Sequence, residues 1–328
     1  MTKLRPFSLS ALALLIGVTC CGERCALASQ VDRSIQGKPP LQTARATEHK
    51  GGSASCQVEA DKRTTDKLLH SREYRKAVKL LKHNQECAPK DEDIQDKLVF
   101  AYLKCKLVKE AREQAKNATL GAPLERKIRI AHVLNSGGDF SEVQAILKEA
   151  IDSGDDSAPV HAELGRAYLG QKEYEDSVRQ LGRAVQLNPE TESYSIDLAS
   201  ALLSWGNFPT ALKFLEAVRG RFGNSPKFLY DQAWAYYGLR QTAHTVEILQ
   251  TVVQTEPDWD LAHYSLGNAF SMLGDLAGAE KQYRSAISLD ESNVDYHIAL
   301  GRFLRERDAV TDAITVLTKA MNLDPHNM

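Results

Sequence analysis

The stretch that decides the fold is residues 260–293, thirty-four residues that read DLAHYSLGNAFSMLGDLAGAEKQYRSAISLDESN. Its first half has small and apolar residues three or four apart, on one face of a helix: Leu266, Gly267, Ala269, Phe270 and Leu273. Gly274 is a typical left-handed helix stop, and Asp275 is a typical N-cap for a second helix. That helix carries Ala279, Tyr283, Ala286 and Ile287. The stretch therefore predicts a helical hairpin, which must pack against similar neighbours to bury its core.

The same spacing recurs along the chain, with a period equal to the length of this stretch. In the position for close helix packing, Gly267 lies three periods after Gly165 and one period before Gly301. Alanines in the second helix follow the same register: Ala211, Ala279 and Ala313. Turn glycines are each followed by a candidate N-cap: Gly138 by Asp139, Gly206 by Asn207, and Gly274 by Asp275. The step from Pro123 to Pro189 is two residues short of a multiple of the period, which predicts one shortened repeat at 92–123.

With these positions the chain resembles the tetratricopeptide repeat family, whose pattern is W-x2-L-G-x2-Y, then A-x3-F, then P. One copy reads His161, Leu164, Gly165, Tyr168, Ser177, Leu181 and Pro189, and another reads His297, Leu300, Gly301, Leu304, Ala313, Leu317 and Pro325. The resemblance implies an all-α, right-handed superhelical solenoid of about eight helix-turn-helix hairpins. The expected repeats are 58–91, 92–123, 124–157, 158–191, 192–225, 226–259, 260–293 and 294–327, an array over 58–327.

Residues 1–28 have the pattern of a secretory signal peptide. Lys3 and Arg5 precede an apolar run over residues 7–18, and small residues at 26–28 predict cleavage before Ser29. The run is short of the ~20 residues that span a bilayer, so a membrane anchor is disfavoured. A lipid-modified Cys20 or Cys21 is the alternative. We therefore expect an exported, periplasmic protein, with residues 29–57 as a disordered linker.

Three cysteines remain after removal of the signal: Cys56, Cys87 and Cys105. The start of the first helix and the end of the second lie near each other in a hairpin, which makes a Cys56–Cys87 disulfide a hypothesis. Such a bond would clamp the terminal repeat. Cys105 is expected to be a buried free thiol.

Charge is uneven along the chain. Residues 58–130 hold 18 Lys/Arg against 12 Asp/Glu, whereas residues 131–328 hold 16 against 28. Most of the basic residues, such as Arg72, Lys76, Lys79 and Lys82, recur at helical spacing and predict a solvated outer face. The alternative is a basic end that meets anionic lipid, wall polymer or another copy. Nucleic acid is not expected, because no recognised binding motif is present and the mature balance is acidic.

No catalytic, cofactor or metal motif is present in the sequence. His161, His263 and His297 occupy one slot of three repeats, which favours packing over catalysis. We therefore expect a non-enzymatic protein without a cofactor.

The resemblance implies that the first helix of each hairpin lines a concave groove for a peptide or partner protein. The positions carried over for partner binding are Arg166, Tyr230, Trp234, Tyr237, Tyr264, Asn268, Met272, Arg302 and Arg305, with Leu169, Ile196, Ser200 and Ile298 between them. Arg166 or Arg302 is expected to orient a carboxylate.

Tyr230, Trp234 and Tyr237 lie at i, i+4 and i+7, so they share one helix face. An aromatic stripe of this kind is often core. The core face of this helix is expected to come from Ala233, Tyr236 and Leu239, which leaves the stripe for the groove. Groove and inter-repeat packing both stay open from the sequence.

The expected function is a non-enzymatic scaffold that binds a peptide or protein in the groove. Two alternatives stay open: a regulatory part of an enzyme whose catalytic domain is separate, and a cell-envelope structural protein. Repeat arrays normally end in a polar capping helix. The last repeat here has the apolar residues of an internal repeat, at Ala313, Ile314, Leu317 and Ala320, which predicts self-association or a truncated chain.

Overall fold

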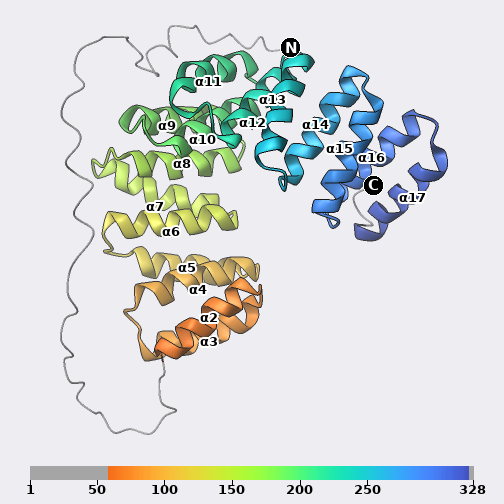
Figure 1. Cartoon of the computed structure of the whole chain (residues 1–328). Coiled ribbons are helices and arrows are strands. Elements are labelled where there is room, and N and C mark those ends of the chain that lie inside the picture. The colour runs from red at the N-terminus through yellow and green to blue at the C-terminus, as the bar shows by residue number, and fades with distance from the viewer. Residues whose placement is uncertain (1–57, 325–328) are drawn as a thin grey trace, which may run out of the picture. The chain divides into compact units, whose positions relative to one another are not determined.

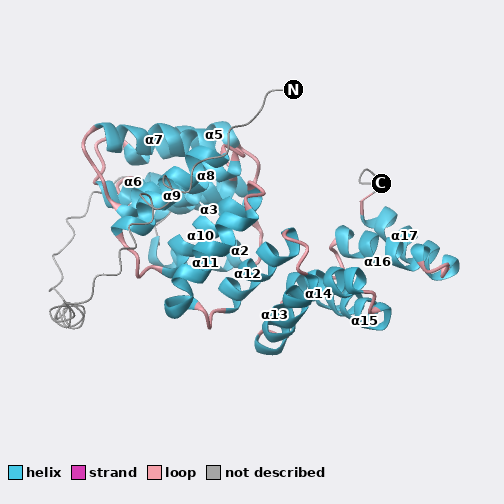
Figure 2. Cartoon of the chain, turned by 90° about the horizontal axis from the view of Figure 1, so that it is seen from above, coloured by secondary structure: helices cyan, strands magenta, loops and turns pink. Residues whose placement is uncertain are grey.

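The computed structural model describes residues 58–324, where every regular element is an α-helix (Figure 1). Loops alone join the helices of this range, as Figure 2 shows. The helices follow one another in eight pairs. The first members are α2 (Val58–His70), α4 (Glu92–Lys104), α6 (Leu124–Gly137), α8 (Ala158–Gly170), α10 (Glu192–Ser204), α12 (Pro226–Gly238), α14 (Asp260–Leu273) and α16 (Val294–Glu306). The second members are α3 (Tyr74–Cys87), α5 (Val108–Thr119), α7 (Phe140–Asp152), α9 (Tyr174–Leu187), α11 (Phe208–Phe222), α13 (Thr242–Thr255), α15 (Leu276–Leu289) and α17 (Val310–Leu323). The predicted all-α fold of about eight hairpins is confirmed.

The chain divides into two compact units, one up to Gly121 and one from Ala122. In the described part the first unit contains α2–α5 and the second contains α6–α17, and within each unit every helix packs against the next. In the second unit α6, α8, α10 and α12 also pack on one another in succession. The first helices of these hairpins therefore lie side by side.

Close helix crossings occur at the predicted glycines. A Cβ added to Gly165 would lie 2.6 Å from Leu181 Cγ, and one added to Gly301 would lie 2.5 Å from Leu317 Cγ. At Gly267 the obstacle would be the Tyr283 ring, at 2.8 Å. These distances are shorter than any side chain tolerates without movement of the neighbour. The glycines let the two helices of a hairpin approach each other closely.

The residue that recurs at the matching position of the second helix is small for the same reason. Ala211, Ala279 and Ala313 are all buried. In the repeat that has serine in this slot, the buried Ser177 hydroxyl donates to the Gly165 carbonyl at 2.8 Å. Serine in this position therefore preserves the close packing, because its buried hydroxyl is hydrogen-bonded where the two helices cross.

A left-handed residue ends the turn inside every hairpin of the described range. Gly138, Gly206 and Gly274 have φ between 78° and 85°. Five residues that are not glycine take the same backbone in the other hairpins: Arg72, Lys106, Lys172, Arg240 and Asp308. Successive positions are one period apart, except that Gly138 follows Lys106 two residues early. This short step is the one expected for a single shortened repeat.

The predicted N-caps differ in what their side chains do. Asp275 caps α15, because its Oδ1 accepts a hydrogen bond from the Gly278 N–H at 2.9 Å. Asp139 and Asn207 occupy the same position before α7 and α11, but neither side chain accepts a capping hydrogen bond from a backbone N–H of the first turn. The capping prediction is therefore wrong at these two positions. In both, the backbone at the N-cap has ψ near 60° rather than the extended value that brings a capping oxygen over the helix end.

The predicted signal at 1–28, the linker at 29–57 and Cys56 lie outside the described residues. Cys87 is disulfide-bonded, whereas Cys105 is a free and partly buried thiol. The pairing of Cys87 with Cys56 stays a prediction. In the last described helix, α17, Val310, Ile314 and Met321 are exposed apolar residues. Self-association through this helix also stays a prediction.

Candidate functional site

A cavity of about 360 Å³ opens where α12, α13 and α14 meet. Its lining is Tyr230, Ala233, Trp234 and Tyr237 from α12, Thr245 and Leu249 from α13, and Leu261, Ser265 and Asn268 from α14. The wall is mostly aromatic and aliphatic, with a few hydroxyl and amide groups. Cavities of this size and composition are typical of binding sites for small molecules or anchoring side chains.

The periodicity of α12 separates its two faces. Phe228 is completely buried, and Ala233 belongs to a core cluster with Val246, Leu249, Leu266 and Ala269. Trp234 is 39% exposed and Tyr237 is 37% exposed, so these rings lie outside the core. Tyr236 and Leu239, expected in the core, are only partly buried, and Tyr236 stacks on His244. The predicted core face is therefore confirmed at Ala233 and only partly at Tyr236 and Leu239, while the buried Phe228 was not predicted.

Tyr230 lines the cavity and is held by contacts within the chain. Its hydroxyl lies 2.9 Å from Ser265 Oγ on α14, and its ring centroid lies 4.9 Å from that of Trp259. Burial raises the pKa of Tyr230, so the ring remains a neutral phenol at neutral pH. This residue joins α12 to α14 and is fixed before any ligand binds.

The remaining predicted binding residues, on α14 and α16, form two groups. Some are held by contacts within the chain, and the others are exposed. Tyr264 is partly buried, with its ring 5.0 Å from that of Tyr296, and Asn268 accepts a hydrogen bond from Tyr283 at 2.8 Å. Met272, Arg302 and Arg305 are exposed. Neither arginine forms an ion pair with any other described residue, so both remain available to an anionic group.

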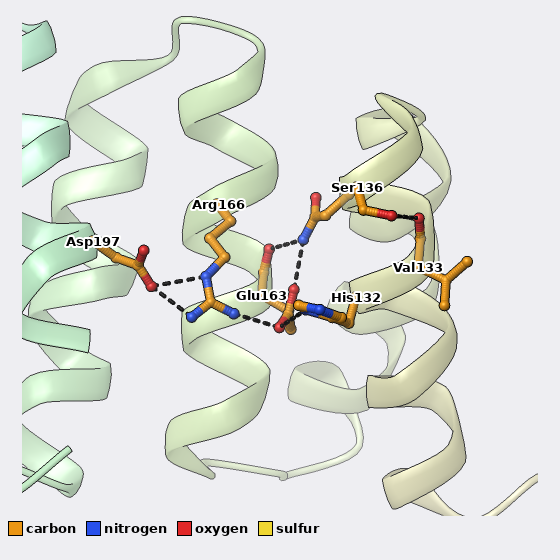
Figure 3. A network of polar contacts seen from close by, with 7 residues as sticks. His132, Val133, Ser136, Glu163, Arg166 and Asp197 are labelled. Atoms are coloured by element: carbon orange, nitrogen blue, oxygen red, sulfur yellow. Dashed lines mark hydrogen bonds and ion pairs between the residues drawn. The ribbon is translucent and has the colours of Figure 1, made fainter. Parts of the chain in front are cut away.

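Arg166 is already engaged within the chain, as Figure 3 shows. Its Nε donates to Asp197 Oδ2 at 2.7 Å, and its Nη1 donates to Glu163 Oε1. Burial alone would lower the pKa of Arg166, but these two carboxylates raise it. The expectation that Arg166 orients a ligand's carboxylate is therefore not supported, because two carboxylates of the chain already neutralise its charge.

His132 of α6 extends this network to the preceding hairpin (Figure 3), and Asn135 of the same helix also takes part. His132 Nδ1 lies 3.0 Å from Glu163 Oε1, and Asn135 Nδ2 donates to Glu163 Oε2 at 2.8 Å. This network was not predicted from the sequence. A usable signal was present, since Glu163, Asp197 and Asp231 occupy one slot at a spacing of one period.

Other features of the described residues are simpler. The basic residues Arg72, Lys76, Lys79 and Lys82 are exposed, as a solvated outer face requires. Between residues 58 and 324 there is no group of three or more His, Cys, Asp or Glu side chains arranged to hold a metal ion. None of the helices described has both the length and the apolar character needed to cross a membrane.

The placement of Trp234 outside the core predicts a small effect on stability. We expect Trp234→Ala to lower the free energy of unfolding by about 1–2 kcal/mol, because 39% of this residue is already exposed to water. Phe228→Ala on the same helix should cost about 3–5 kcal/mol, because that ring is fully buried. Urea unfolding of the two variants measures both values. Equal losses would place Trp234 in the core.

Comparison with known proteins identifies the family. The family model described as tetratricopeptide repeat matches residues 162–227, 230–293 and 264–327, which together cover half of the chain. The chain belongs to the tetratricopeptide repeat family. Proteins of this family are scaffolds for protein–protein interaction and are generally not catalytic. The chain is thus a repeat scaffold for interaction with other proteins.

The individual relatives are distant. BBSome complex member BBS4 from Bos taurus is 22% identical over 241 residues, which is 72% of this chain but 40% of that protein. Cell division cycle protein 27 homolog A from Arabidopsis thaliana is 37% identical over 59 residues, 18% of this chain and 8% of that protein. The chain therefore spans less than half the length of either relative.

Solved structures share the fold over most of the chain. The APC/C hetero-tetramer Cut9-Hcn1 has a TM-score of 0.57 and 13% identity, over 83% of this chain and 54% of that one. The human IFIT1 dimer with m7Gppp-AAAA has a TM-score of 0.54 and 15% identity, over 82% and 69%. At these identities the likeness concerns the fold alone.

Proposed function

We propose that the chain binds an extended segment of a partner protein along its first helices, with the cavity at α12–α14 as the anchoring point. The observation that carries this proposal is the exposure of Trp234 and Tyr237 at a cavity of about 360 Å³. Tryptophan and tyrosine contribute most to interface energy when a partner desolvates them, and a cavity beside them accepts a partner's side chain. Ser265 and Asn268 add polar groups to the lining, which supports orientation of the bound segment.

The exposure of Trp234 and Tyr237 is energetically unfavourable, which supports the same binding role. Two large aromatic side chains that are more than one-third exposed forgo burial energy that a self-contained core would gain. Tyr230, by contrast, is held by Ser265 and Trp259, so the cavity is already formed before a partner arrives. A preformed cavity lowers the conformational entropy lost on binding.

The test is selection of twelve-residue peptides from a random library on the whole chain. We expect the selected peptides to bind Trp234→Ala/Tyr237→Ala at least tenfold more weakly than wild type. Leu187→Ala is the matched control, because Leu187 is similarly exposed but lies on the second helix α9. It should change the affinity less than twofold. Equal binding by wild type and the double variant, at equal thermal stability, would contradict the proposal.

Export is a second part of the proposal, which the pattern of residues 1–28 supports. N-terminal sequencing of the mature protein from its native host should begin at Ser29. A mature chain that begins at Met1 would contradict export.

A further inference from the structure

The first helices carry a series of polar pairs that link one hairpin to the next. In each pair a side chain contacts the residue 31 positions later: His132 with Glu163 at 3.0 Å, Arg166 with Asp197 at 2.7 Å, and Ser200 with Asp231 at 3.4 Å. The three acceptors are themselves one period apart, and so are their three partners. Figure 3 shows the first two pairs, with Arg166 lying between Glu163 and Asp197.

The third pair lacks the cation that the second contains. Arg166 reaches Asp197 with two nitrogens, Nε at 2.7 Å and Nη2 at 2.6 Å. Ser200 occupies the same slot one hairpin later, but its short side chain offers only a hydroxyl at 3.4 Å. At this position the chain therefore supplies a hydroxyl to the carboxyl group of Asp231, where one hairpin earlier it supplies a guanidinium to Asp197.

Asp231 is nevertheless almost completely buried, with an exposed fraction of 5%. A carboxyl that is buried without a cation is unfavourable in its charged form. Burial accordingly raises the pKa of Asp231 to about 7, against the small opposing effect of the Ser200 hydroxyl. The charged group that acts on Asp231 from a helix packed on α12 is Asp197 of α10, which raises the pKa further. The local field therefore favours a cation.

We propose that Asp231 accepts the cationic side chain of an arginine in the bound partner, in the place that Arg166 occupies against Asp197 one hairpin earlier. This inference rests on the proposed function and specifies the chemistry of its ligand. Asp231 is a neighbour in sequence of two residues that line the cavity. It follows Tyr230 directly and precedes Trp234 by three positions. A guanidinium at Asp231 is within one helical turn of the Trp234 ring, on which arginine stacks favourably. Ser200, which donates a hydrogen bond to Asp231, is itself only partly buried.

Arginine fits better than lysine for two reasons that the chain itself shows. The equivalent carboxylate, Asp197, is bound by the planar fork of Arg166 through two nitrogens. A fork also leaves further N–H groups for the Ser200 hydroxyl and for Asp197, whereas an ammonium group is a compact point charge. The anchoring element of the partner is therefore an arginine near an apolar residue that fills the cavity.

The experiment uses two twelve-residue peptide libraries that differ only in one fixed central residue. That residue is arginine in one library and citrulline, which has the same shape without the charge, in the other. Selection is carried out on the whole chain at pH 8, above the pKa of Asp231. We expect the best arginine peptide to bind wild type at least tenfold more tightly than its citrulline version, and Asp231→Asn to reduce this preference below twofold.

A second variant imitates the proposed ligand. Ser200→Arg places a guanidinium in the slot that Arg166 fills one hairpin earlier, so it should raise the melting temperature and remove the preference for arginine over citrulline. Gln250→Arg is the matched control, because it adds the same charge at an exposed position of the second helix α13. It should leave the preference unchanged.

The outcomes separate this inference from the proposed function. If peptides bind and depend on Trp234, but arginine and citrulline bind alike, the function stands and the role of Asp231 is wrong. If Asp231→Asn retains the tenfold preference, the cation is recognised elsewhere and the inference is again overturned. If neither library yields a binder, both the proposed peptide binding and the proposed recognition of arginine by Asp231 are wrong.

Discussion

Gly165→Leu is expected to lower the free energy of unfolding by about 3 kcal/mol, the upper end of the usual cost of overpacking. The first added carbon would lie 2.6 Å from Leu181 Cγ and 3.1 Å from the Leu181 backbone nitrogen. A side chain can rotate away from such a contact, but the backbone nitrogen can move only if α8 and α9 separate. Urea unfolding monitored by circular dichroism measures the change.

Gly220→Leu is the control for this substitution. Gly220 also lies in a helix, α11, but a Cβ there would meet no atom within 4 Å. The same change should therefore alter the free energy of unfolding by less than about 1 kcal/mol, mainly through helix propensity. Similar losses for the two variants would mean that the Gly165 crossing is not the close contact described here.

Asp231→Asn is expected to raise the free energy of unfolding at pH 8, by about 2–4 kcal/mol. An aspartate in the unfolded chain titrates near pH ~3.9, whereas burial raises the folded pKa of Asp231 to about 7. The folded chain thus holds this proton more tightly than the unfolded chain does. Stability is lost as the pH rises through the window between these values, and the loss is complete above pH ~7.

The expected advantage of Asp231→Asn therefore shrinks towards zero as the pH falls to about 4, where both states of wild type are protonated. Urea unfolding of wild type and variant at several pH values gives the difference directly. Asp258→Asn is the control, because Asp258 is exposed and should change stability by less than about 0.5 kcal/mol at every pH. A variant that is less stable than wild type at pH 8 would show that the ionised carboxylate stabilises the fold.

A stabilising effect of Asp231→Asn would also bear on function. Residues that weaken the fold are kept where binding requires them, and binding sites often show this conflict between stability and activity. Asp231 is such a residue, because its carboxyl group is hydrogen-bonded to the Ser200 hydroxyl where the equivalent Asp197, one hairpin earlier, is paired with Arg166.

The sequence predicts the hairpins well because their determinants are local. The close crossing at Gly165 and the turn at Gly274 follow from residue size and from backbone freedom, both of which can be read from a single repeat. The left-handed turns at Arg72 and Arg240 are invisible in composition, because tertiary packing imposes a conformation that arginine does not prefer. They become predictable only once the register of the repeat is known.

The candidate site is less accessible to sequence reasoning. The spacing of Tyr230, Trp234 and Tyr237 predicts a shared face, but the sequence could not choose between groove and core. The difference in burial between Phe228 and Trp234 distinguishes the two faces of α12. The engagement of Arg166 could not be read from its own helix, because its partner Asp197 belongs to the next hairpin. Contacts between hairpins depend on the distance between their first helices. This distance cannot be read from the sequence pattern of a single hairpin.

The most direct test of the proposed binding face is hydrogen exchange of the whole chain with and without the selected arginine peptide. We expect the peptide to slow amide exchange in α12 and α14, the first helices that carry Trp234 and Asn268, with smaller changes in α13 and α15. Slower exchange confined to the second helices, or to α2–α5, would contradict it.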